Sequence, residues 1–252
     1  MANNRQTVTL LRKNKQEQVA ALQALGFENV TVNTKASLFP IYAKWANGLL
    51  DCTIAANRAS DDKAFYFTKE EWSLMNNTQR SEYLIRGIRL RSHGMSFVIA
   101  TNVFGGAKWG AVTDVANVPN YTSHSELYKD RNAERYNSLI LAAQSGNGNT
   151  AIELCHDYMA YSQQIDGRDD SSRWVMGCVA HYVEVHRYRD EIDSCLAVVF
   201  GNSYAQQLRG DILTCSEYDA SKIWVLNITN GRLYYDNKNS TSFYYLPISI
   251  EI

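Results

Sequence analysis

Residues 1–60 alternate short apolar runs with polar breaks and predict a small N-terminal segment. Apolar residues recur at helical spacing in 16–25 and Gly26 follows them, which predicts a short helix that ends at the glycine. Short strands are expected at 30–32, 38–42 and 51–56. Pro40 interrupts the second of these runs and limits it to the edge of a sheet. We interpret 1–60 as an arm or small subdomain, because so short a segment builds little core of its own.

A capping box marks the start of the next helix. The side chain of Thr68 can accept from the first-turn amides while Glu71, three residues later, reaches back to the threonine N–H. This pattern predicts a helix through about Asn76. A second helix is expected over 79–85, ended by Gly87.

Two β-rich runs follow, at 88–91 and 96–100, and His93-Gly94 between them predicts a hairpin. Residues 102–136 are rich in Gly, Asn, Ser and Tyr and are expected to be irregular. A long irregular stretch in a compact domain usually carries function or is ordered by a partner.

The second half of the chain predicts helices and then strands. Asn149 is expected to cap a helix over 150–162, and the clearest apolar periodicity in the chain predicts one long helix over 181–199. Asn230-Gly231 predicts a hairpin. Strands are expected at 212–215, 223–228, 232–235 and 243–250. Helices and strands are segregated and do not alternate as βαβ units, which predicts an α+β fold.

Composition narrows the classes of function. Hydrophobic residues make up 45% and charged residues 20% of the 252 residues, as in a folded soluble protein. The net charge of -1 leaves no excess of positive charge for a phosphate backbone, so no nucleic-acid partner is expected. No run of about 18 apolar residues occurs, so no membrane span is expected. The 16 Tyr and 5 Trp suit either a sheet core or a contact surface, and both interpretations stay open.

The cysteines indicate a redox environment. An odd number of them, without a Cys-x-x-Cys pair, argues against both a disulfide framework and a zinc ribbon. They are Cys52, Cys155, Cys178, Cys195 and Cys215. The polar, basic start of the chain lacks the apolar core of a secretory signal. We therefore expect reduced, mostly buried thiols in a protein assembled in a cytoplasm.

Catalytic and metal-binding patterns are not found in the sequence. His181 and His186 are five positions apart and do not share a helix face, so they and Glu184 between them are interpreted as solvated helix positions. A thiol–imidazole pair of Cys178 with His181 is the weaker interpretation, because buried cysteines are usually inert. The acidic residues of 166–170 are interpreted as a solvated turn and not as a calcium site. We predict no catalytic residue, no cofactor, no metal and no enzymatic activity.

Several short motifs occur in a specific order along roughly 65–252. They are Glu70-Glu-Trp72, 86–91, 97–100, Gly148-Asn-Thr150, Trp174, Glu191-Ile192, Cys215-Ser-Glu217-Tyr218, 223–227 with Asn230-Gly231, and 244–248. Their order and spacing resemble the DUF1566-type C-type-lectin-like domains of bacterial surface proteins and of virion proteins of tailed Bacteroides phages, including crAss-like phages. Three departures are Met176-Gly177, where the family has a proline after the tryptophan, Cys215, where it has a serine, and Leu246, where it has an arginine. Sugar binding is therefore not carried over from the family.

The resemblance implies a fold for residues 61–252. This fold is C-type-lectin-like, with antiparallel strands and two helices, and follows the small N-terminal segment. Early and late strands pair in such a fold, so 88–91 is expected beside 243–248. The implied fold anchors are Trp72, Trp174, Trp224 and Pro247.

The resemblance also implies a bacteriophage virion structural protein. It would decorate the capsid as an auxiliary capsid protein, or attach a fibre or tail, by protein–protein docking. The expected partners are the major capsid protein, fibre or tail components and a second copy of the chain, in a virion assembled in the host bacterial cytoplasm. Segments 102–136 and 200–211 are the expected docking loops. The alternative is a glycan-binding adhesin of the host surface. Docking or glycan contacts are expected at Trp109, Tyr121, Tyr128 and Tyr204.

Overall fold

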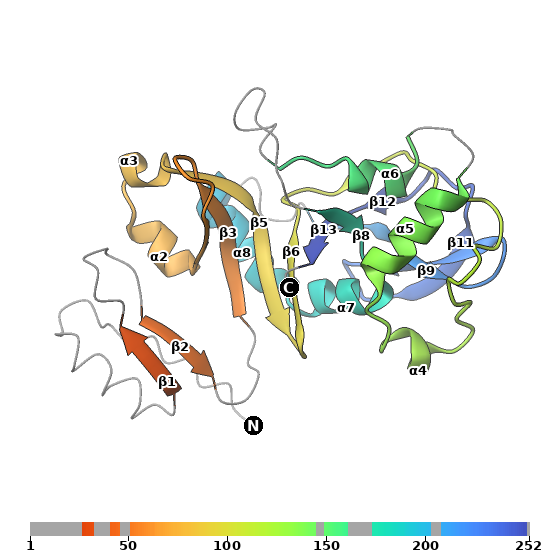
Figure 1. Ribbon diagram of the computed structural model, residues 1–252, viewed down its shortest axis with the longest axis horizontal. Coiled ribbons are helices and arrows are strands. Elements are labelled where there is room, and N and C mark those ends of the chain that lie inside the picture. Colours follow the sequence, from red (N-terminus) through yellow and green to blue (C-terminus); the bar gives the residue numbers. More distant parts are fainter. Residues whose placement is uncertain are drawn as a thin grey trace. The chain divides into compact units, whose positions relative to one another are not determined.

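The computed structural model describes residues 27–32, 41–45, 51–144, 149–160, 173–202 and 208–250. The chain divides into two compact units, Met1–Leu49 and Leu50–Ile252. In the first unit, β1 (Phe27–Val32) and β2 (Ile41–Trp45) form an antiparallel two-stranded sheet (Figure 1). The strand predicted at 30–32 lies within β1, while the predicted helix at 16–25 lies outside the described residues.

The larger unit contains a six-stranded sheet in which every neighbouring pair is antiparallel (Figure 1). Its strands, in spatial order, are β4 (Ala64–Phe67), β3 (Asp51–Arg58), β5 (Tyr83–Ser92), β6 (Met95–Ile99), β13 (Pro247–Ile250) and β8 (Trp174–Met176). The run predicted as a strand at 51–56 is confirmed as β3. Because β3 pairs with β5 along its whole length, it belongs to the larger unit, and the N-terminal unit ends before residue 60.

The predicted helix at 79–85 is wrong. The helix α3 (Asn77–Arg80) forms a single turn, and β5 begins at Tyr83. Strand β5 lies between β3 and β6 in the sheet, and its consecutive residues Leu84–Ile88 are all buried, so side chains on both faces of the strand are covered. Gly87 is not a helix stop: a Cβ there would lie 2.0 Å from the Ile99 carbonyl oxygen, so the glycine allows β5 and β6 to approach.

The predicted hairpin at His93-Gly94 is confirmed, and it changes the expected strand order. His93 and Gly94 both have positive φ, 48° and 76°, as the tight turn between β5 and β6 requires. Ile99 of β6 pairs with Ile88 on one side and with Ile248 on the other. The expected pairing of 88–91 with 243–248 is therefore wrong, because β6 occupies the position between them.

A five-stranded sheet completes the larger unit, in the order β11 (Leu233–Asn237), β10 (Lys222–Asn227), β9 (Asp211–Glu217), β12 (Tyr244–Tyr245) and β7 (Phe104–Gly105). The β10–β11 hairpin confirms the prediction at Asn230-Gly231, where Gly231 has φ 74°. Strand β12 pairs parallel to β9, so this sheet is mixed, whereas purely antiparallel strands were expected.

The described residues contain more helices than the two that the family resemblance implies. Besides α3 they are α2 (Lys69–Leu74), α4 (His124–Leu127), α5 (Ala133–Ala143), α6 (Ala151–His156), α7 (Val179–Arg187) and α8 (Arg189–Phe200). The capping box of α2 is confirmed, with Thr68 and Glu71 exchanging both hydrogen bonds. The N-cap of α6 is Thr150, which forms its own capping box, and not Asn149, which has φ 77°. Helix α6 ends at His156, short of the predicted end at 162.

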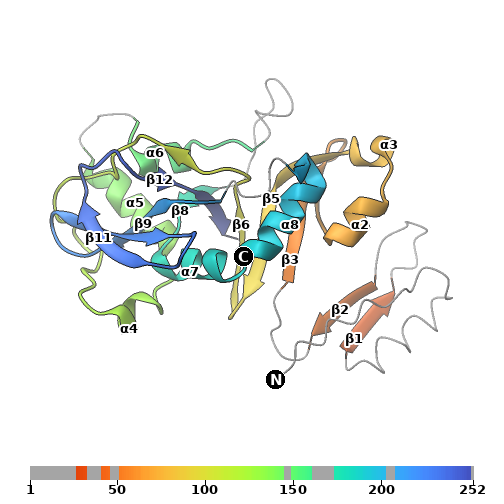
Figure 2. The ribbon, with the colours of Figure 1, turned by 180° about the vertical axis from the view of Figure 1, so that it is seen from behind.

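The single helix predicted over 181–199 is also wrong. Helices α7 and α8 meet at Tyr188, whose φ of -111° and ψ of 22° interrupt the helical path. Helix α7 packs on β9 and β10, whereas α8 packs on β3 and β5 (Figures 1 and 2). Because the two helices cover different sheets, the chain turns between them. The architecture is α+β, with helices packed on two sheets.

Candidate functional site

The four residues expected as fold anchors are all buried in the larger unit. They are Trp72, Trp174, Trp224 and Pro247. Pro247 opens β13 in the interior of the six-stranded sheet and pairs with Met176 of β8, while Trp174 opens β8 and pairs with Ser249. Trp224 belongs to a core cluster with Leu127 and Val179.

Trp109 is not a surface contact, contrary to the sequence prediction. Its side chain is 0% exposed, and its indole N–H donates to the Thr214 carbonyl oxygen at 2.7 Å. The ammonium group of Lys238 lies 4.9 Å from the ring centroid. A large ring that can satisfy its one donor inside the protein gains most by burial, so Trp109 serves the core. Tyr204 lies outside the described residues.

Tyr121 lies beside Trp224, and Tyr128 follows it seven residues later in the chain. The Trp224 indole N–H donates to the Tyr121 carbonyl oxygen at 2.8 Å. The Tyr121 hydroxyl donates to the Asp130 carboxylate at 2.5 Å, and burial together with this carboxylate raises the pKa of Tyr121. The Tyr121 side chain therefore stabilises the segment 121–130, whereas Tyr128 is 46% exposed and can contact a partner.

Tyr218, Tyr235 and Lys222 complete an aromatic surface that the sequence prediction missed. The two tyrosine rings stack with centroids 3.9 Å apart, and each presents an edge or face to Trp224, at 5.3 and 5.8 Å. The Lys222 ammonium lies 5.0 Å from the Tyr235 centroid and 5.9 Å from that of Tyr218. The proximity of the Tyr235 hydroxyl raises the pKa of Tyr218.

His124 joins Tyr128 to the same group of rings. Its centroid lies 5.2 Å from that of Trp224 and 6.3 Å from that of Tyr128. We call the six residues the Trp224 cluster: His124, Tyr128, Tyr218, Lys222, Trp224 and Tyr235. His124 lies in α4 and Tyr128 directly follows that helix, while the other four residues come from β10, from β11 and from the residue that follows β9. The β10–β11 hairpin forms one edge of the five-stranded sheet.

A sequence signal for part of this cluster existed. Trp224 and Tyr235 are direct partners in the β10–β11 hairpin, so their side chains share a face. The register follows from the turn at Asn230-Gly231. The contribution of α4 lies about a hundred residues away in the chain, and only the tertiary structure brings it to the hairpin.

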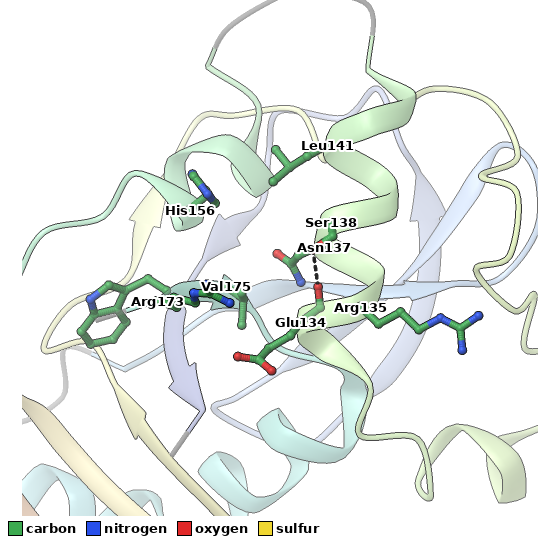
Figure 3. Close-up of a pocket in the computed structure, with 9 residues that line it drawn as sticks. Glu134, Arg135, Asn137, Ser138, Leu141, His156, Arg173 and Val175 are labelled. Atoms are coloured by element: carbon green, nitrogen blue, oxygen red, sulfur yellow. Dashed lines mark hydrogen bonds between the residues drawn. The ribbon is translucent and has the colours of Figure 1, made fainter. Parts of the chain in front are cut away.

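A hollow of about 540 Å³ lies between α5 and β8 (Figure 3). Charged side chains line it, but they do not converge: Glu134 and Arg135 leave α5 in opposite directions (Figure 3). The amide of Asn137 is committed to the backbone, donating to the Ala133 and Met176 carbonyl oxygens at 2.8 Å each. Among the described residues that line the hollow, Glu134, Arg135 and Asn137 therefore do not converge on one point.

Cys178 and His181, the candidate thiol–imidazole pair, are both buried and contact different neighbours. The Cys178 thiol lies 3.2 Å from the Cys215 thiol, burial raises the pKa of Cys178, and His181 packs edge-on against Phe97. Burial, aided by the positive charge of Arg131, lowers the pKa of His181 to about 4. No thiol–imidazole hydrogen bond between Cys178 and His181 is found in the described part of the chain. Residues 166–170, the acidic turn, lie outside it.

His181 and Glu184 are not solvated helix positions as predicted, because both are buried. Glu184 accepts from the Ser92 hydroxyl and from Arg187 at 2.7 Å each, and its Oε2 lies 3.1 Å from the exposed His93 ring. The carboxylate thus ties the β5–β6 turn to α7. Within the described ranges, no group of three or more His, Cys, Asp or Glu could hold a metal ion, and no helix is long and apolar enough to cross a membrane.

Comparisons with known proteins add no family to this picture. No family model, no curated protein and no solved structure matches the chain.

Proposed function

We propose that the chain is a structural protein of a tailed bacteriophage virion that acts by docking onto other virion proteins. Its larger unit would be a divergent C-type-lectin-like scaffold, and its role would be capsid decoration or attachment of a fibre or tail component. The order of the sequence motifs supports the family, and an α+β unit with two sheets is compatible with it. No enzymatic step is part of the proposal.

The Trp224 cluster is the observation that carries the docking proposal. Tyr128 and Tyr235 are 46% and 45% exposed; the Tyr235 ring stacks on that of Tyr218 with centroids 3.9 Å apart, and the Tyr128 ring lies 6.3 Å from that of His124. Tyrosine buries a large area at a low cost in conformational entropy and keeps a hydroxyl for a polar rim, so such residues serve as interface anchors. Lys222 adds a cation over the rings, which favours a partner surface with acidic or carbonyl groups. Multiple copies on a particle would add avidity to modest single contacts.

Mass spectrometry of purified virions tests the assignment to the particle. The chain should co-purify with capsid and tail proteins at a fixed copy number. Hundreds of copies indicate the shell, and about a dozen indicate the tail vertex, because copy number follows particle symmetry. Absence of the chain from intact particles of a phage that encodes it would overturn the proposal.

Two substitutions test the surface. Tyr235→Ser and Tyr128→Ala should each reduce occupancy on particles by about tenfold, the loss of about 1.4 kcal/mol of binding, while leaving the thermal midpoint nearly unchanged. Leu74→Ser is the matched control, because Leu74 is a 66% exposed apolar residue of α2, remote in sequence and on the other sheet. Equal occupancy of all three variants would show that the cluster is not the docking surface. Particle occupancy that is unchanged together with lost binding on a glycan array would favour the adhesin alternative.

A further inference from the structure

Four of the five cysteines lie in two thiol pairs. The Sγ atoms of Cys178 and Cys215 are 3.2 Å apart, and those of Cys52 and Cys195 are 4.0 Å apart. The fifth, Cys155, is fully buried, and burial raises its pKa. The odd count and scattered spacing in the sequence gave no sign of this pairing.

The Cys52–Cys195 pair joins segments that are distant in the chain. Cys52 is in β3 and Cys195 is in α8, 143 residues later. Helix α8 lies across β3 and β5, so the packing of this helix on the sheet brings the thiols together (Figure 2). The Cys195 thiol is also 3.9 Å from the Cys52 carbonyl oxygen, which places both sulfur atoms in one contact region.

The two pairs differ in their access to solvent and in their reactivity. Cys178 and Cys215 are both 0% exposed, whereas in the other pair Cys52 is half-buried and Cys195 is 2% exposed. Hydrogen bonding from the Cys52 thiol lowers the pKa of Cys195, helped by the positive charge of Lys69, and the same contact raises the pKa of Cys52. Burial raises the pKa of Cys178. Since the thiolate is the reactive form, Cys195 is the stronger nucleophile of this pair, and the half-buried Cys52 beside it opens the pair to solvent.

We propose that Cys52 and Cys195 form an oxidative modification site, which a hydroperoxide converts into a disulfide crosslink in the folded protein. The Cys195 thiolate attacks one peroxide oxygen, the O–O bond breaks, and the released hydroxide takes a proton to become water. Cys52 then attacks the sulfur of the Cys195 sulfenic acid, forming the S–S bond and releasing a second water. Two thiols lose one electron each, and one hydrogen peroxide is reduced to two waters.

The order in which the two thiol pairs oxidise should not follow their sulfur–sulfur distances. The Cys178 and Cys215 thiols are closer together, yet the Cys52–Cys195 link should form first, because both members of the closer pair are fully buried whereas Cys52 is partly exposed to solvent. The link should raise the thermal midpoint by about 5 to 10 °C, because it closes a long loop in the unfolded chain. Dithiothreitol should reverse that shift.

Peptide mapping of the full chain provides the test. The native protein is treated with hydrogen peroxide for increasing times, quenched with catalase, denatured, alkylated and digested without reduction. The expected first product is a linked Cys52–Cys195 peptide, with Cys155, Cys178 and Cys215 still alkylated. First formation of a Cys178–Cys215 or Cys155–Cys215 link, or overoxidation of Cys52 or Cys195 without a link, would overturn the proposal.

Matched variants extend the test to stability. Cys195→Ala should abolish both the link and the peroxide-induced rise in thermal midpoint, while Cys155→Ala, which alters a buried cysteine outside the pair, should keep both. A rise that survives in Cys195→Ala would show that another reaction causes it. If Cys195→Ala fails to fold, the mapping of the unmodified sequence still decides. The inference does not depend on the proposed virion role.

Discussion

At the scale of single residues, the interior holds ionisable groups whose charge state is set by burial. His181 is 2% exposed, packs against Phe97 and has an Nδ1 atom that is buried without a hydrogen-bond partner. Burial, with the nearby Arg131, lowers its pKa to about 4, from an ordinary value of about 6.5. The folded protein therefore holds His181 neutral in the pH range where the unfolded chain protonates it.

This histidine should make the protein less stable in mild acid. Between about pH 6.5 and pH 4 the unfolded state binds a proton at His181 and the folded state does not. The free energy of unfolding is therefore highest above pH 6.5 and decreases as the pH falls towards 4, by up to about 3 kcal/mol from this group. Urea unfolding at pH 7 and pH 5 measures the effect. His181→Leu should lose less stability over that range than the unsubstituted protein. Equal losses would show that His181 is not the responsible group.

The buried ion pair of Lys238 and Glu217 poses a second test at this scale. Both side chains are almost completely buried, and the Lys238 ammonium also donates to the Thr113 carbonyl oxygen at 2.8 Å. Lys238→Met leaves a carboxylate in the core without its cation, which should cost about 3 to 5 kcal/mol in denaturant unfolding. The double variant Lys238→Met with Glu217→Leu should recover most of that loss. A double variant as unstable as the single one would contradict the assignment of the loss to the unpaired charge.

At the scale of elements, the close approach of β5 and β6 depends on Gly87. Gly87→Ala would place a Cβ 2.0 Å from the Ile99 carbonyl oxygen, in the backbone of the neighbouring strand. The strands would have to separate, and we expect a destabilisation of about 3 kcal/mol, at the upper end for overpacking. Thermal unfolding gives the measurement. Arg91→Ala, an exposed position of the same strand, is the control and should change stability by less than about 0.5 kcal/mol. Similar effects of the two substitutions would argue against the steric explanation.

The elements that the sequence predicted correctly share a local cause. The capping box at Thr68 and the turns at His93-Gly94 and Asn230-Gly231 depend on residues adjacent in the chain, and each is found in the structure. The helix α5 carried a similar signal that the prediction missed, since Ala133, Tyr136, Asn137 and Ile140 are its buried face. The Gly- and Asn-rich sequence before it obscured that pattern.

At the scale of the whole larger unit, the consecutive helices α7 and α8 link the two sheets, because each helix packs on a different one. Helix α7 covers β9 and β10, and α8 covers β3 and β5, with the turn at Tyr188 between them. The last strand, β13, lies between β6 and β8 in the interior of the six-stranded sheet. Residues from both ends of this unit must therefore be in place before the sheet is complete, which makes its contacts strongly non-local.

The sequence by itself determined the α+β class, the capped start of α2 and the two tight turns, because these depend on composition and on neighbours along the chain. The burial of Trp72, Trp174 and Trp224 was expected from the family resemblance. Only the tertiary structure decided that 83–92 is a strand, that α7 and α8 separate at Tyr188, that Trp109 is internal, and that Tyr218 and Tyr235 join Trp224. The pairing of Cys52 with Cys195 belongs to the same group. Each of these features is set by which surface a segment is packed against, and that surface comes from residues far away in the chain.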